Sequence, residues 1–210
     1  MLDIFSGLRH DQVKFVQKTY LVLSGALAIM TVLGVFSYFF LPPVAALPVL
    51  ILDSIIWIAC GWFGLRNPIK AVFPVFLIIT GLALGQIAHF YRPDVFFAAG
   101  ITTLMIFAGT SAYVFFTKQD FSFLRVALNI GFWILLAAAI LSFFLNLSAF
   151  SLIIGIFGSL IFIGWILYDT SKILLRADEL NYNENLGAFD LFMDIIGLFS
   201  FVRSLFKILD

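Results

Sequence analysis

The sequence is poor in side chains that bind metals or form cross-links. Of its 210 residues one is a cysteine, Cys60, and two are histidines, so an intramolecular disulfide is excluded and a cysteine metal site is not expected. With only His10 elsewhere, His89 is better explained as a residue at the membrane interface than as a metal ligand. No P-loop, HEXXH or nucleophile–base motif is present. The sequence therefore predicts a protein that is not an enzyme and carries no cofactor.

Charged residues are also scarce. They make up 11% of the chain and balance to a formal net charge of zero, whereas 63% of the residues are hydrophobic. An average soluble domain is about 25% charged and about 45–50% apolar, so this chain has more apolar surface than a soluble core can hide. The zero net charge argues against nucleic acid as a partner. The expected surroundings are the lipid bilayer.

Seven apolar stretches are long enough to cross a bilayer, which takes roughly 20 residues each. They are too long for strands and lack alternation, so helices are predicted. The expected architecture is an all-α membrane protein with an N-terminal tail, 1–18, and a single seven-helix transmembrane domain, 19–210. The predicted spans are 19–41, 44–65, 71–90, 95–117, 126–145, 149–168 and 188–209.

Lysine and arginine are distributed unequally between the two predicted sides of the membrane. One side receives Arg9, Lys14, Lys18, Arg66, Lys70, Lys118, Arg125, Lys172 and Arg176, and the other receives Arg92, Arg203 and Lys207. Because basic loops stay in the cytoplasm, the N-terminus is predicted to be cytoplasmic and the C-terminus to be outside. The last two basic residues leave a second arrangement open, in which the final span re-enters the membrane.

Two aspartates, Asp169 and Asp194, lie at or inside the last two apolar stretches. A carboxylate in hydrocarbon costs roughly 2.5–3.5 kcal/mol on insertion scales, so such acids are usually paired and functional. The short connection between these stretches predicts antiparallel neighbouring helices with the two acids at similar depth. Two close carboxylates cannot both ionise cheaply. We therefore expect the pair to share a proton and to act as a pH-sensing gate.

The other ionisable residues in these stretches have more than one interpretation. Asp169 is alternatively a solvated helix end. Asp190 lies four residues before Asp194 and shares its helix face. Asp53, deep in the second stretch, either joins the same polar core or neutralises a basic residue on another helix. Arg203 is a candidate counter-charge, but it lies on roughly the opposite helix face from Asp194, and extension of its side chain to the far interface is the alternative.

A pair of aspartates on neighbouring spans also occurs in intramembrane aspartyl proteases. Those enzymes carry Tyr-Asp on one span and Gly-x-Gly-Asp on the next. Tyr168 and Asp169 match the first motif, but residues 190–194 read DLFMD and have no glycine before Asp194. Without a backbone loosened by glycine, a substrate strand has no obvious place to lie, which argues against a protease.

Four segments together resemble the Bax inhibitor-1 family, in particular its bacterial YccA-like branch. The segments are 18–24 (KTYLVLS), 109–124 (GTSAYVFFTKQDFSFL), 166–173 (ILYDTSKI) and 190–199 (DLFMDIIGLF). The second of these is the most specific match, and the resemblance covers nearly the whole chain. It implies a seven-helix bundle with the last helix near the centre, in a bacterial inner membrane.

The resemblance also implies a function, namely a pH-sensitive calcium leak gated by Asp169 and Asp194, with transient calcium near both acids. It places Asp53 and Arg66 where some relatives have an acid and a basic turn. The candidates for the ion pathway or for a counter-charge are therefore Asp53, Asp190, Arg66 and Arg203. Calcium prefers six to eight oxygen ligands, so three acids and a few hydroxyls would attract the ion without caging it, as conduction requires. Some bacterial relatives instead associate with a membrane-anchored ATP-dependent protease and moderate it. A non-conducting regulator of such a protease is therefore the alternative function.

Overall fold

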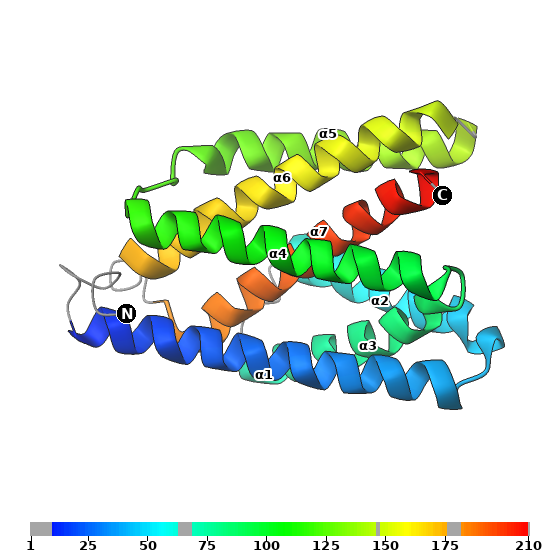
Figure 1. The fold of residues 1–210 in the computed structure, drawn as a ribbon, viewed down its shortest axis with the longest axis horizontal. Helices are drawn as coiled ribbons and strands as arrows, with labels where there is room; N and C mark the ends of the chain where they lie inside the picture. The colour runs from blue at the N-terminus through cyan, green and yellow to red at the C-terminus, as the bar shows by residue number, and fades with distance from the viewer. Residues whose placement is uncertain (1–9, 63–68, 146–147, 176–181, 210) are drawn as a thin grey trace.

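The computed structural model describes residues 10–62, 69–145, 148–175 and 182–209. These residues form seven membrane-length apolar helices and one short 3-10 turn, and no strand (Figure 1). The elements are α1 (His10–Phe40), η1 (Pro43–Ala45), α2 (Ala46–Trp62), α3 (Ile69–Ala88), α4 (Pro93–Thr117), α5 (Leu124–Leu145), α6 (Ser148–Leu175) and α7 (Glu184–Leu209). The predicted all-α membrane bundle is confirmed, and the chain is a multi-pass membrane protein.

Several helix ends follow directly from the local sequence. α1 ends ahead of Pro42 and Pro43, because proline cannot continue a helix. α4 begins with Pro93 at its first position, where the missing N–H has no intrahelical partner to lose. The same helix ends at Thr117 and is capped by Lys118, which has a left-handed backbone (φ 51°) and donates its N–H to Val114 O at 2.8 Å.

Three helices extend beyond the predicted apolar stretches by a turn or more. α1 begins at His10, so residues 10–18 belong to a helix and not to a separate tail. α6 continues to Leu175, about two turns beyond the predicted end, and α7 begins at Glu184, about one turn before the predicted start. Polar residues continue these helices because they meet protein partners there. Asp169 consequently lies within α6 and not at its end.

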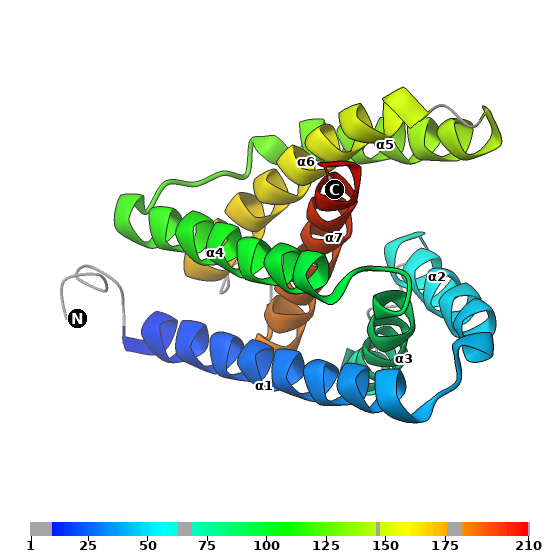
Figure 2. The ribbon, with the colours of Figure 1, turned by 45° about the vertical axis from the view of Figure 1, so that its right-hand side comes forward.

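α7 is the central helix of the bundle. It packs against α1, α3, α4 and α6, and Figure 2 shows these helices arranged around it. Of its apolar window 72% is buried, against 11% for α2 and for α5 on the outside. The helix is continuous from Glu184 to Leu209, so the last span crosses the bundle and does not re-enter. The central position that the family resemblance implied is confirmed.

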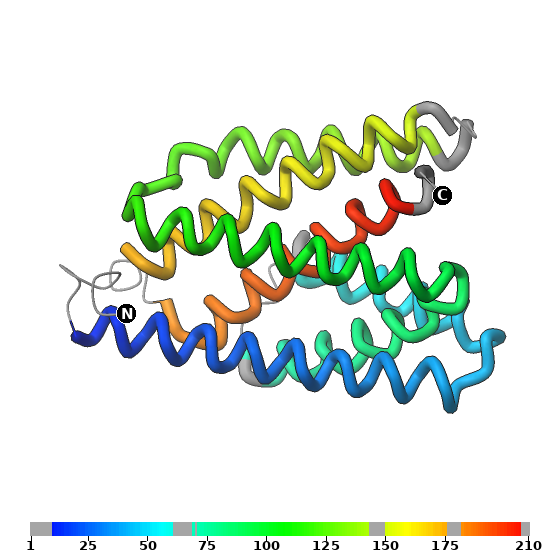
Figure 3. Tube along the Cα trace, viewed as in Figure 1, coloured from blue at the N-terminus to red at the C-terminus, as the bar shows by residue number. Residues whose placement is uncertain are grey.

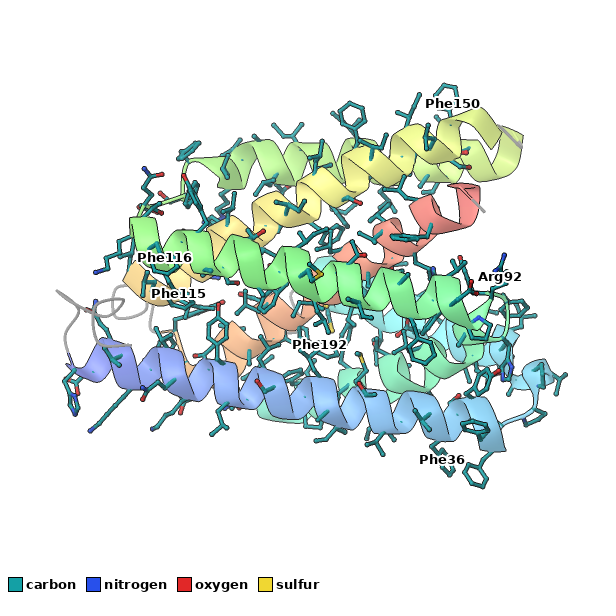
Figure 4. All side chains as sticks on the ribbon, in the orientation of Figure 1. Phe36, Arg92, Phe115, Phe116, Phe150 and Phe192 are labelled. Atoms are coloured by element: carbon teal, nitrogen blue, oxygen red, sulfur yellow. The ribbon has the colours of Figure 1, made fainter. Side chains whose placement is uncertain are left out.

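Aromatic side chains separate the interior from the surface that faces lipid. Phe192 of α7 is fully buried and packs edge-on against Phe73 and Phe76 of α3, with ring centroids 5.7 and 6.0 Å apart. Figure 4 shows Phe192 between the helices, whereas Phe36 and Phe150 project from outer faces, where each is 48% exposed. The bundle thus fills its core with rings and leaves apolar surface for lipid.

Close contact between α6 and α7 depends on glycine. A Cβ at Gly158 of α6 would lie 2.3 Å from the ring of Phe201, and one at Gly197 of α7 would lie 2.1 Å from the ring of Phe162. Each helix therefore offers a glycine that receives an aromatic ring of the other. The two helices run antiparallel side by side (Figure 3), which confirms the prediction that they are neighbours.

Candidate functional site

Three aspartates are buried where α6 ends and α7 begins. Asp169 on α6 is 5% exposed, and Asp190 and Asp194 on α7 are 4% and 5% exposed. Both helices continue past these acids toward the connecting loop, so none of the three is a helix end in water. The interpretation of Asp169 as a solvated helix end is therefore wrong. Buried carboxylates need charged or hydrogen-bonding partners.

Lys172 provides a charged partner between the two helices. Its Nζ donates to Asp169 Oδ1 at 3.2 Å on its own helix and to Asp190 Oδ2 at 2.9 Å on α7. It also donates to Tyr182 Oη at 3.0 Å and lies 4.0 Å from the centre of that ring. The hydroxyl of Tyr182 in turn donates to Asp190 Oδ2. An ion-pair network thus connects α6, the start of α7 and the residue that leads into it.

Hydroxyl groups beside the acids tie the same turn of α6 to other elements. Thr170 Oγ1 and Ser111 Oγ of α4 lie 3.4 Å apart, and either can donate to the other. Ser171 Oγ accepts a hydrogen bond from the backbone N–H of Phe121, in the connection between α4 and α5, at 3.2 Å. Ser171 Oγ also donates to Tyr168 O at 2.9 Å. Consecutive residues of this turn therefore contact α7, α4 and the link to α5.

The structure places Asp194 one helical turn further along α7 than Asp190, as the spacing predicted. Between the two helices, the structure shows ion pairs of Lys172 with Asp169 and with Asp190. A direct contact in which Asp169 and Asp194 share a proton stays a prediction. Within the described residues, no group of three or more His, Cys, Asp or Glu side chains is arranged to hold a metal ion. The acids of this part of the chain are thus not arranged as a tight metal centre.

Asp53 lies in a different contact from the α6–α7 acids. Its Oδ1 accepts a hydrogen bond from Thr80 Oγ1 of α3 at 2.7 Å, and α2 packs against α3 and η1. The structure therefore places Asp53 between α2 and α3. The sequence suggested either a shared core with the other acids or a basic partner, and the contact observed is with a hydroxyl group.

Arg203 does not act as a counter-charge to the acids in the described residues. Its guanidinium lies over the ring of Tyr91, 4.6 Å from the centroid, and 5.8 Å from that of Phe199. These rings are contacts toward the C-terminal end of α7, far along the helix from Asp194. A cation above aromatic faces gains electrostatic energy without a carboxylate. Arg66, the other predicted counter-charge, lies outside the described residues.

Comparison with known proteins agrees with this architecture. Residues 12–210 match the protein-family model described as "Inhibitor of apoptosis-promoting Bax1". The chain belongs to the Bax inhibitor family. It is similar to mouse "Protein lifeguard 4", with 30% identity over 186 residues that cover 82% of this chain and 76% of the relative. It is also similar to fission yeast (Schizosaccharomyces pombe) "Bax inhibitor 1", with 31% identity over 175 residues, 77% of this chain and 65% of the relative. A Vibrio cholerae "Uncharacterized membrane protein" is 39% identical over 110 residues, half of each chain (50% and 49%).

Two residues of this Bax inhibitor family site were not selected from the sequence. From the sequence, Lys172 was a basic residue beside the membrane and part of the segment 166–173, although its position three residues after Asp169 puts both on one helix face. Tyr182 lies in the polar segment before α7, where nothing in the sequence pairs it with Asp190. The helical spacing was a usable signal for Lys172, whereas the contact of Tyr182 with Asp190 is visible only in the structure.

Proposed function

We propose that this Bax inhibitor family protein is a passive, pH-sensitive cation leak that admits calcium and is gated by Asp169 and Asp194. One observation carries the proposal: three carboxylates are buried where α6 meets the central helix α7, one on α6 and two on α7. Buried ionisable groups in membrane spans usually mark ion or proton pathways. This is a transport function and involves no enzymatic reaction.

The charge state of these acids also controls a contact between helices. The ammonium of Lys172 on α6 lies 2.9 Å from Asp190 Oδ2 on α7, and this ion pair depends on the negative charge of the carboxylate. Tyr182 and Asp169 face the same ammonium, and Asp194 follows one turn deeper. Because α7 touches four other helices, a change in its contact with α6 affects the centre of the bundle. The acids therefore combine proton exchange with a position suited to gating.

The arrangement favours weak passage of calcium over storage. The described acids do not converge as a metal centre, whereas a high-affinity calcium site supplies six to eight oxygens at once. Carboxylates at the mouth of a bundle, with the hydroxyls of Ser111 and Thr170 nearby, attract a cation and let it leave. Conduction requires this balance.

Flux through purified protein in calcium-loaded vesicles tests the proposal. We expect calcium release to vary with pH in the wild type, and Asp194→Asn to remove that pH response because the amide cannot ionise. Asp94→Asn is the matched control, since Asp94 is an exposed acid paired with Arg92 at the other end of α4. Equal flux and equal pH response in the wild type and Asp194→Asn would overturn the gate.

We also propose that the protein lies in a bacterial inner membrane with its N-terminus in the cytoplasm. The uneven distribution of basic residues supports this orientation. It puts the start of α1 and the α6–α7 acids on the cytoplasmic side, because both lie at the same end of the bundle (Figure 1). A cysteine introduced at Asp120, in the α4–α5 link, should react with an impermeant thiol reagent only after cell lysis. Labelling of this cysteine in intact cells would contradict the proposed orientation.

A second candidate function is regulation of a membrane-anchored ATP-dependent protease without conduction. The observation in its favour is the start of α1, which presents exposed charged side chains at Asp11, Lys14 and Lys18. A partner protease would bind the charged side chains at this end of the helix. Co-purification with the protease that disappears when Asp11, Lys14 and Lys18 are replaced by uncharged residues, together with absent calcium flux, would favour this candidate over the leak.

A further inference from the structure

The ammonium of Lys172 occupies the position of a bound cation. It lies between carboxylates that come from two different helices, Asp169 Oδ1 at 3.2 Å and Asp190 Oδ2 at 2.9 Å. The Lys172 side chain is 13% exposed, so the contact is largely withdrawn from water. A free cation that entered between these two carboxylates would meet the same oxygens that Lys172 already holds.

The surroundings match a primary ammonium group in number and geometry. An ammonium has three N–H donors and no acceptor, and three oxygens accept from this one, from Asp169, Asp190 and Tyr182. The aromatic face of Tyr182, 4.0 Å from Nζ, adds the attraction of a ring for a cation. Every donor of the Lys172 ammonium is thus matched by an acceptor.

We propose that Lys172 is a tethered cation that fills an ammonium site in the pathway, so that a permeating ion has to displace it. The proposal rests on the leak function for its effect on flux, but the site itself is a property of the described side chains. Lysine is suited to this role, because its charge sits on a flexible four-carbon stem that can leave the site while remaining attached. A divalent ion competes with the single charge of Lys172 better than a monovalent ion does.

Flux measurements on charge variants test the blocking role. Lys172→Met keeps most of the side-chain volume without the charge, and we expect it to raise calcium flux roughly tenfold, the lower end for loss of contacts to a charged group. Sodium flux should rise as well, because the monovalent ion no longer competes with the lysine. Lys172→Arg keeps the charge and should stay within about twofold of the wild type.

Lys18→Met is the matched control. It removes the same charge at the same end of the bundle. Lys18, however, is 66% exposed, and its ion pair with Glu184 is long at 4.0 Å. Its flux should equal that of the wild type. If Lys172→Met and Lys18→Met give the same flux as a conducting wild type, Lys172 does not block the pathway.

Chemical rescue distinguishes a cation site from an ordinary ion pair between helices. Lys172→Ala leaves a space for the propylammonium fragment that the truncation removes. Added n-propylammonium should lower the flux of Lys172→Ala toward the wild-type level and raise its melting temperature. Tetramethylammonium has the same charge but no N–H donor and should do neither, and Lys172→Met should not respond because its side chain fills the space.

The two arms separate failure of the site from failure of the leak. If the wild type and all variants release no calcium, the proposed function is overturned, and the melting temperature of Lys172→Ala with n-propylammonium still decides the site. If n-propylammonium does not raise the melting temperature of Lys172→Ala more than tetramethylammonium does, the ammonium site is overturned. If Lys172→Ala does not fold, the same comparison is made in Lys172→Ala combined with Asp190→Asn, which restores the charge balance and keeps Asp169 and Tyr182 as acceptors.

Discussion

The crossing of α1 and α3 is so close that one methyl group should force the helices apart. A Cβ added at Gly85 would lie 2.2 Å from the carbonyl oxygen of Gly34, 2.7 Å from Ser37 Cβ and 2.9 Å from Tyr38 N. Ordinary Cβ contacts begin near 3.4 Å, so Gly85→Ala requires a separation of roughly 1 Å in a core that packs like a crystal. None of these atoms is the end of a flexible side chain, so no rotamer change relieves the overlap.

The separation also strains a buried polar contact beside Gly85. Gln86 Nε2 donates to Ser37 Oγ at 3.0 Å and to Ser37 O at 3.2 Å. Overpacking costs about 1–3 kcal/mol and weakened hydrogen bonds about 0.5–1.5 kcal/mol, while the better helix propensity of alanine offsets about 1 kcal/mol. The net loss is about 0.5–3.5 kcal/mol, which corresponds to a fall in melting temperature of roughly 1–14 °C.

Thermal unfolding of purified protein in detergent measures this loss. Gly25→Ala is the control, because Gly25 lies on α1 with nothing within 4 Å of an added Cβ. It should melt at the wild-type temperature or slightly above it. If Gly85→Ala and Gly25→Ala melt within about 1 °C of each other, the two helices do not cross as closely as the structure shows and the steric reasoning is refuted.

Two further predictions concern the site. Tyr182→Phe keeps the ring beside Lys172 but removes a hydroxyl that donates to Asp190, so the free energy of unfolding should fall by about 1.5–3 kcal/mol; Tyr113→Phe, at an exposed tyrosine, should change it by less than about 0.5 kcal/mol, and equal losses would contradict the assignment. Asp190→Asn removes the carboxylate that pairs with Lys172 between the helices, so the free energy of unfolding should fall by about 3–5 kcal/mol, whereas Asp94→Asn, at an exposed ion pair, should leave the melting temperature near that of the wild type. Equal melting temperatures in the two variants would contradict a buried ion pair at Asp190.

Hydropathy was sufficient for the helices because each apolar run has one low-energy structure in lipid. It failed at helix ends, where charged residues were taken as boundaries. A charged residue such as Lys172 is assigned to a loop by its hydropathy. It lies in a helix here because the fold brings Asp169 and Asp190 next to it. The same holds at the start of α1, where the buried Val16 lies within the segment expected as a tail. A boundary set by tertiary contacts has no local signal.

The site was predictable to the extent that one helix determines it. The burial of Asp194 and its common face with Asp190 follow from spacing and apolar neighbours. Which group meets which across α6 and α7 does not follow, because it depends on the rotation and depth of both helices. Arg203 shows the limit clearly, since an isolated basic residue suggested a carboxylate partner and the fold provides the ring of Tyr91.

Consecutive positions in one turn of α6 connect the acids to the rest of the bundle. Asp169 and Lys172 belong to the ion-pair network with α7. Thr170 contacts Ser111 of α4, and Ser171 Oγ accepts a hydrogen bond from the backbone N–H of Phe121. A helix turn directs successive side chains about 100° apart, so rotation of α6 that releases one contact displaces the others. The hydroxyl contacts therefore help to hold α6 in the rotation at which Lys172 reaches Asp190.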